Sequence, residues 1–129
     1  MLPLNEISTQ ALAYLGDCVI ELMVRELLVE RGIASSGKLN AAALEFVRAS
    51  AQAAATERIL PLLSEEEERY YRRGRNSTHL NIPKRARPGE YRMATGMETL
   101  FGYLHLSGQI ARARELFAAA YPQETTDQE

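Results

Sequence analysis

The sequence predicts an all-α fold in one domain, and three features of the chain favour it. The length of 129 residues is enough for one domain with a single hydrophobic core. Eighteen Ala, seventeen Leu and fifteen Glu stand against four Val and six Ile, and unbranched side chains lose little rotamer freedom in a helix. Apolar residues also recur at three- and four-residue spacing. Because so small a domain has little room for a deep cavity, we expect a large ligand to bind on its surface or between subunits.

The first predicted helix covers residues 8–31. Gly32 follows it and is placed to end it, because glycine readily adopts the left-handed conformation that closes many helices. One face of this helix is apolar, and we expect that face to be buried. Its apolar residues are Leu12, Leu15, Val19, Leu22 and Met23.

A second helical stretch covers residues 37–63, and its length predicts a break near Ser50. Ser64 and Glu67 have the spacing of a capping box, in which each side chain satisfies a backbone amide of the first turn. This capping box predicts a short helix that ends near Arg73.

The segment 74–90 is the predicted loop, because it contains Gly and Pro without sustained periodicity. Helix resumes over 91–106 and again after Gly108. We therefore expect one domain over 1–122 and a polar C-terminal tail over 123–129.

Charge is unevenly distributed along the chain. Residues 72–92 carry a balance of +6 and the rest of the chain carries −8, so the formal net charge of −2 hides a basic segment on an acidic body. Such a protein can bind phosphate groups at one place without binding polyanions over its whole surface. A solvated loop with scattered charges is the alternative interpretation, and composition does not choose between the two.

Composition also excludes several classes of protein. The single cysteine, Cys18, rules out an internal disulfide and a cysteine-built zinc site, and we expect it to pack in the core. No apolar run approaches the roughly 20 residues of a membrane span, and no secretory leader opens the chain. These features predict a cytoplasmic protein with no membrane partner.

Acids on two separate predicted helices are candidate metal ligands. Asp17 lies in the middle of the first helix among mostly apolar neighbours, where Asp is a poor helix former. Glu21 lies one turn further on and repels it, whereas Glu98 lies in the helix over 91–106. Carboxylate oxygens are the ligands that Mg²⁺ prefers. Acids that merely edge a core helix are the structural alternative.

Glycines beside these acids indicate how they could meet. Glycine costs about 1 kcal/mol relative to alanine inside a helix, yet Gly16 precedes Asp17, and Gly96 and Gly102 flank Glu98. If Gly16 meets either of them at a helix crossing, the two carboxylates face each other, and a divalent cation would offset their repulsion. Glycines that act only as packing spacers are the alternative.

Three segments resemble the ribonuclease III class of endonucleases. LAYLGDCVIELMVRELL is similar to the signature helix of that class, and ATGMETLFGYLHLSG is similar to its second metal-binding helix. The RGRN loop, Lys84 and the pair Tyr91-Arg92 resemble the Mini-ribonuclease III branch, an endonuclease domain without a double-stranded-RNA-binding domain. The resemblance covers nearly the whole chain. It implies a ribonuclease III endonuclease-domain-like helical bundle that acts as a homodimer.

The resemblance also implies a reaction and the residues that perform it. Asp17 corresponds to the catalytic aspartate and Glu98 to the glutamate that binds catalytic Mg²⁺, with one or two ions per site and Glu21 as a secondary ligand. Larger members of the class carry carboxylates where this chain has Ala13 and Thr95, so its metal shell has fewer protein ligands. The expected activity is hydrolysis of double-stranded RNA to 5′-phosphate and 3′-hydroxyl ends.

The expected substrate is a large-subunit ribosomal RNA precursor, with a ribosomal protein as an assisting partner. The basic segment offers groups that bind phosphates and 2′-hydroxyls, although a structural ion pair is the alternative for Arg92. We expect His79 to lie on the loop surface. Two other functions stay open: a non-catalytic RNA-binding protein of the same fold, and a nucleotide pyrophosphohydrolase that uses the glutamate run over 65–68. The predicted RNA-binding residues are Arg73, Arg75, Asn76, Lys84, Arg85 and Arg92.

Overall fold

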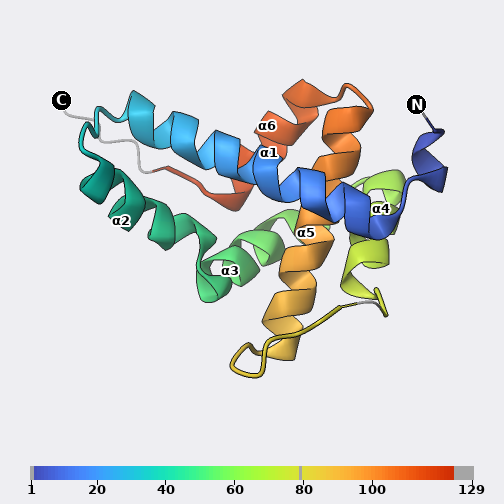
Figure 1. Ribbon diagram of the computed structural model, residues 1–129. Coiled ribbons are helices and arrows are strands. Elements are labelled where there is room, and N and C mark those ends of the chain that lie inside the picture. Colours follow the sequence, from blue (N-terminus) through green and yellow to red (C-terminus); the bar gives the residue numbers. More distant parts are fainter. Residues whose placement is uncertain (1, 79, 124–129) are drawn as a thin grey trace.

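Six α-helices and two short 3₁₀ helices occur in the computed structural model, which describes residues 2–78 and 80–123 (Figure 1). These ranges contain no strand, which confirms the predicted all-α fold class. None of the described helices is long and apolar enough to cross a membrane. The 3₁₀ helices are η1 (Leu4–Glu6) and η2 (Leu60–Leu62), and the α-helices are α1 (Thr9–Glu30), α2 (Ser36–Val47), α3 (Ala49–Ile59), α4 (Glu65–Arg75), α5 (Pro88–Leu106) and α6 (Ile110–Ala120).

Helix α5 is the centre of the fold, because α1, α3, α4 and α6 all pack against it. Figure 1 shows α1 crossing α5, with α4 alongside α5 and α3 on its other flank. Met97, Leu100, Phe101 and Leu104 of α5 are completely buried. A helix surrounded in this way is apolar on most of its circumference, so a polar residue on α5 that reaches the surface needs an explanation.

Two glycines let α1 and α5 approach to backbone contact, as the sequence predicts. A Cβ atom on Gly16 would lie 1.6 Å from the backbone oxygen of Glu98, and one on Gly102 would lie 2.0 Å from the backbone oxygen of Leu12. Any side chain at either position would therefore force the two helices apart. The third candidate, Gly96, packs against α4 instead.

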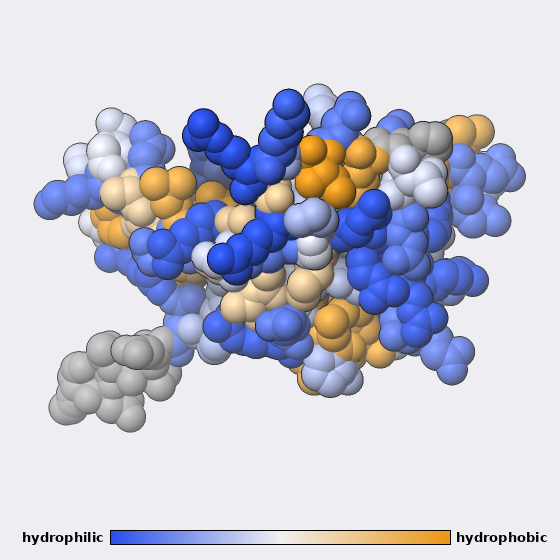
Figure 2. Space-filling view, turned by 90° about the horizontal axis from the view of Figure 1, so that it is seen from below, coloured by the Kyte–Doolittle hydropathy of each residue, from blue (hydrophilic) through white to orange (hydrophobic). Residues whose placement is uncertain are grey.

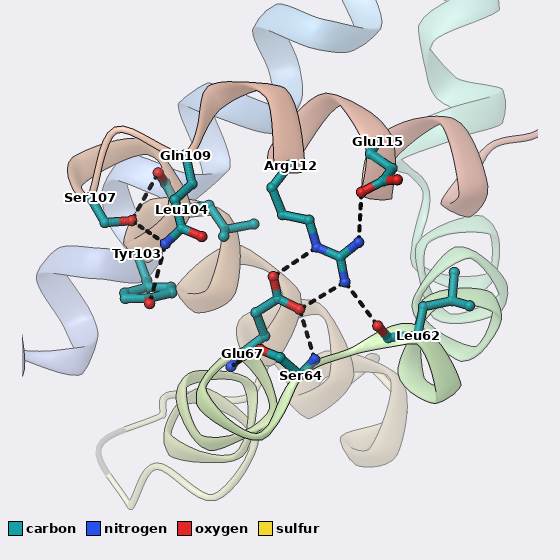
Figure 3. Close-up of polar contacts among 9 residues, drawn as sticks. All are labelled: Leu62, Ser64, Glu67, Tyr103, Leu104, Ser107, Gln109, Arg112 and Glu115. Carbon is teal, nitrogen blue, oxygen red and sulfur yellow. Dashed lines mark hydrogen bonds and ion pairs between the residues drawn. The ribbon is translucent and has the colours of Figure 1, made fainter.

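A buried ion pair fixes the start of α4 against α6 (Figure 3). The Glu67 carboxylate accepts hydrogen bonds from Nε and Nη2 of Arg112, at 2.8 and 2.9 Å. The same guanidinium donates to the backbone oxygen of Leu62 at 2.8 Å. Ser64 and Glu67 also form the predicted capping box. Hydrogen bonding from Arg112 holds the pKa of Glu67 below its ordinary value although burial opposes this, so the pair fixes the orientation of α4.

The predicted bounds of the loop over 74–90 are wrong at both ends. Helix α4 continues through Gly74, which packs so tightly that a Cβ atom there would lie 2.7 Å from the backbone oxygen of Thr95. Helix α5 begins at Pro88, a residue that suits the first helical turn because the N–H that it lacks would have no partner there. The loop between the two helices is therefore residues 76–87.

Burial along α1 and the break after α2 also differ from the prediction. Cys18 is exposed and does not pack in the core, and Leu22 is 54% exposed. The prediction fails here because hydropathy does not distinguish a face buried in the subunit from one left on its surface. The break predicted near Ser50 lies at Arg48, whose extended backbone separates α2 from α3.

Candidate active site

Asp17 and Glu98 line one pocket, of about 210 Å³, beside the crossing of α1 and α5. The contact of the two backbones at Gly16 brings the next residue of α1 beside Glu98 on α5. Two acids that are 81 positions apart in the chain are therefore neighbours in the fold. The rest of the wall consists of Thr9, Gln10, Ala13, Tyr14, Ser77, Leu80, Tyr91 and Thr95.

The two carboxyl groups interact directly. Burial, the negative charge of Asp17 and a hydrogen bond with the Asp17 side chain together raise the pKa of Glu98 from 4.5 to about 8. Without a cation, Glu98 thus holds a proton at neutral pH. A cation between the groups would reverse this balance, because it stabilises the charged form of both carboxylates.

The donor set fits a hard divalent cation such as Mg²⁺, which prefers carboxylate oxygens and keeps several waters. Within residues 2–78 and 80–123, no group of three or more His, Cys, Asp or Glu side chains is placed to hold an ion. Water or substrate oxygens would therefore complete the shell around Asp17 and Glu98. The Glu21 carboxylate accepts a hydrogen bond from Nε of Arg25 at 3.0 Å, and its role as a secondary ligand stays a prediction.

The raised pKa of Glu98 predicts that the metal-free protein loses stability as the pH rises. Glu98 binds its proton more tightly in the folded state than in the unfolded chain, so its stabilising contribution is complete below pH 4.5 and is lost as the pH rises to about 8. We expect the Tm in chelator to fall by about 5–10 °C between roughly pH 5 and 8. The Tm of the Glu98→Gln variant should fall much less over this pH range, because glutamine has no charge to bury. An equal fall in the Tm of both proteins would contradict the raised pKa of Glu98.

Two of the predicted RNA-binding arginines have partners within the protein. Arg73 donates a hydrogen bond to the backbone oxygen of Ile7 at 2.9 Å, which ties α4 to the segment before α1. Arg92 donates to the backbone oxygens of Arg75 and Ser77, at 3.2 and 3.0 Å, and so holds the start of the loop against α5. Their contacts show a positioning role beside the pocket, and RNA contact by either arginine stays a prediction.

The other predicted RNA-binding residues lie around the loop. Nε of Arg75 donates to Oδ1 of Asn76 at 3.1 Å, and Lys84 and Arg85 are exposed. The loop lies at the lower end of Figure 1, and Figure 2, which shows the molecule from below, presents a largely hydrophilic surface with small, separate hydrophobic patches. Such a surface does not suit a large apolar partner. His79 lies outside the described residues.

The glutamate run at the start of α4 does not form a second acidic site. Glu66 and Glu68 each pair with an arginine one turn further along α4, and Glu67 pairs with Arg112. These acids are neutralised locally and do not converge on an ion. The geometry therefore gives no support to a pyrophosphohydrolase built on this run.

The structure adds residues that the sequence analysis did not single out. Tyr14 is 85% exposed and lines the pocket one turn before Asp17. Gln52 and Glu90 line a second pocket, which shares Glu98 with the first. The three-residue spacing from Tyr14 to Asp17 could have indicated that Tyr14 lies beside the site. No signal in the sequence connects Gln52 on α3 with Glu98, because only the packing of α3 on α5 brings them together.

Known proteins share both the sequence and the fold. Residues 10–109 match the ribonuclease III domain. The chain is 48% identical over 109 residues to Mini-ribonuclease 3 of Symbiobacterium thermophilum, with 84% of each chain covered. It is 41% identical over 114 residues to Mini-ribonuclease 3 of Enterococcus faecalis, with 87% and 86% covered. A crystal structure of a protein from Fusobacterium nucleatum superposes with a TM-score of 0.78 at 26% identity, covering 87% of this chain and 89% of the other.

Proposed function

The chain belongs to the ribonuclease III family, in its Mini-ribonuclease 3 branch, and we propose that it cleaves double-stranded RNA at the pocket of Asp17 and Glu98. Family membership makes it a ribonuclease III class endoribonuclease. The observation that supports this site is that Asp17 and Glu98 line one pocket beside a basic loop, close enough for Asp17 to raise the pKa of the half-buried Glu98. A protein that only bound RNA would gain nothing from like charges placed together next to its phosphate contacts.

When bound, Mg²⁺ supplies an activated water at neutral pH and withdraws negative charge from the transition state. In this proposal Asp17 and Glu98 hold one or two such ions. Asp17 is the more exposed of the two residues, so it faces the substrate and orients the attacking water. The half-buried Glu98 would hold the ion against α5. Cleavage on the 3′-oxygen side of the phosphate leaves 5′-phosphate and 3′-hydroxyl ends.

The loop over 76–87 supplies the phosphate contacts in this proposal. Its exposed Lys84 and Arg85 bind the RNA backbone, so recognition depends on the A-form shape more than on sequence and weakens as salt rises. We propose large-subunit ribosomal RNA precursor in the cytoplasm as the substrate, with a ribosomal protein as an assisting partner.

Cleavage of a defined RNA duplex tests the proposed activity. We expect cutting in Mg²⁺, none in chelator, and none of a DNA duplex of the same sequence, with 5′-phosphates on the products. The rate should fall as salt rises, because each phosphate contact releases counterions. Binding of duplex RNA without cutting under any divalent metal condition would favour a non-catalytic RNA-binding protein of the same fold.

An apolar stripe on α1 is the surface through which we propose that a homodimer forms. Tyr14, Leu22 and Val29 are 85%, 54% and 63% exposed, and Cys18 lies between the first two. Exposed apolar side chains that gather on one face mark interaction sites. Because Tyr14 also lines the pocket, pairing of two stripes would join two pockets in one groove, with one site for each RNA strand.

The Leu22→Glu substitution tests this interface. It places a charge in the stripe at a position that the subunit core does not use, so we expect a monomer with little loss of fold. Sedimentation velocity measures the change. The matched control is Leu44→Glu on α2, where the leucine is also more than half exposed, and that variant should stay a dimer. A dimeric Leu22→Glu protein or a monomeric wild type would contradict the proposed interface.

A further inference from the structure

Glu98 borders a second pocket, of about 240 Å³, on the side of α5 that faces α3. Tyr91, Thr95 and Glu98 line both pockets, and their spacing places them along one face of α5. The second pocket therefore adjoins the first across this row of side chains. Its other lining residues are Val47, Ala49, Gln52, Ala86, Arg87, Glu90 and Ala94.

Of the two α3 residues that line this pocket, Ala49 and Gln52, only Gln52 has a polar side chain. Its amide can both donate and accept hydrogen bonds. Gln52 is half-buried on α3, and its backbone oxygen accepts a hydrogen bond from Oγ1 of Thr56 at 2.8 Å. Within the described residues, its side-chain amide makes no hydrogen bond. The amide is therefore available to a ligand in the pocket.

The charges around the pocket determine the kind of group that it would accept. Two acids, Glu90 and Glu98, line it with a single basic residue, Arg87. A phosphate would meet no excess of positive charge there even with Glu98 protonated, which disfavours it. A neutral hydroxyl group avoids that repulsion and can both donate to and accept from an amide.

We propose that the second pocket binds the ribose of a nucleotide next to the cleaved phosphate, and that Gln52 hydrogen-bonds its 2′-hydroxyl. This inference rests on the proposed cleavage of duplex RNA at Asp17 and Glu98. A backbone that crosses the shared row on α5 places its phosphate at one pocket and its neighbouring sugar at the other. The wide minor groove of A-form RNA displays 2′-hydroxyls, so Gln52 is a positioning residue that distinguishes RNA from DNA.

The test uses a set of RNA duplexes that each carry one 2′-deoxyribose, placed in turn at the nucleotides beside the cut. Loss of one hydrogen bond to a neutral partner corresponds to about a 10-fold loss in kcat/KM. We expect wild type to lose about that much on one duplex of the set. Gln52→Leu, which keeps side-chain bulk without the amide, should lose about as much on the all-RNA duplex and nothing further on the deoxy duplex.

Two variants control for shape and folding. Gln52→Ala also removes the bulk, so the same insensitivity to 2′-deoxyribose in both variants assigns the effect to the amide. Ser50→Ala, at an exposed position of α3, should keep the wild-type pattern. Thermal unfolding checks that each variant is folded.

The outcomes separate this inference from the proposed function. Wild type that cuts every duplex of the set equally, or Gln52→Leu that stays as sensitive to 2′-deoxyribose as wild type, overturns the ribose subsite and leaves the nuclease assignment standing. Recovery of Gln52→Leu at raised Mg²⁺ would place Gln52 at the ion and also overturn the subsite. Wild type that cuts no duplex overturns both proposals.

Discussion

Asp17→Asn and Glu98→Gln are each expected to reduce the cleavage of duplex RNA in Mg²⁺ by a factor of about 1,000 or more. Each substitution keeps the size of the side chain but removes one of the two carboxylates that line the pocket, and in the proposed mechanism both of these carboxylates hold the ion. Single-turnover rates at saturating enzyme measure the loss, because they report the chemical step without product release. Duplex binding in chelator should persist in both variants.

A matched control is available on α4. Glu66→Gln removes a carboxylate that pairs with Arg69 on the surface, and its cleavage rate should equal that of wild type. The cleavage rate of Glu21→Gln is expected to lie between that of Glu66→Gln and those of Asp17→Asn and Glu98→Gln. The reason is that Glu21 is one turn from Asp17 but pairs with Arg25. Cutting that survives both Asp17→Asn and Glu98→Gln would remove the pocket from the reaction.

Local rules predict the helices of this fold well, and they fail where long-range packing decides. The capping box of Ser64 and Glu67 is local, and the start of α4 follows it. The predicted end of α4 near Arg73 is too early, because glycine in an Arg-rich segment has the composition of a loop. Gly74 is helical here because its missing side chain lets α4 lie directly on Thr95 and Gly96 of α5. This packing of α4 on α5 is a property of the folded molecule and cannot be predicted from the local sequence.

The candidate active site also has some features that follow from the local sequence and others that depend on long-range packing. Gly16 beside Asp17, with a second glycine near Glu98, predicts a close crossing, and the structure has that crossing at Gly16 and Gly102. Gln52 could not be predicted, because its nearness to Glu98 depends on how α3 packs against α5. The exposure of Cys18 could not be predicted either, since a cysteine near the core has the same local pattern whether it faces the core or a partner.

Gly16→Ala is expected to destabilise the protein by about 3 kcal/mol or more and to abolish cleavage. The added methyl carbon would lie 1.6 Å from the backbone oxygen of Glu98, a contact that no rotamer change relieves because both partners are fixed main-chain positions. The helices must separate at the point that brings Asp17 and Glu98 together. Chemical denaturation measures the stability loss, and thermal unfolding should show a fall in Tm on the order of 10 °C.

Gly37→Ala provides the control that separates packing from propensity. Gly37 lies in α2, and nothing stands within 4 Å of a Cβ atom placed there. Alanine at that position reduces the entropy of the unfolded chain and should stabilise the protein by about 0.4–1 kcal/mol. The same chemical change is thus expected to have opposite signs at two helical glycines. Equal stability effects at both positions, or a Gly16→Ala protein that cuts RNA at the wild-type rate, would contradict a site assembled by backbone contact between α1 and α5.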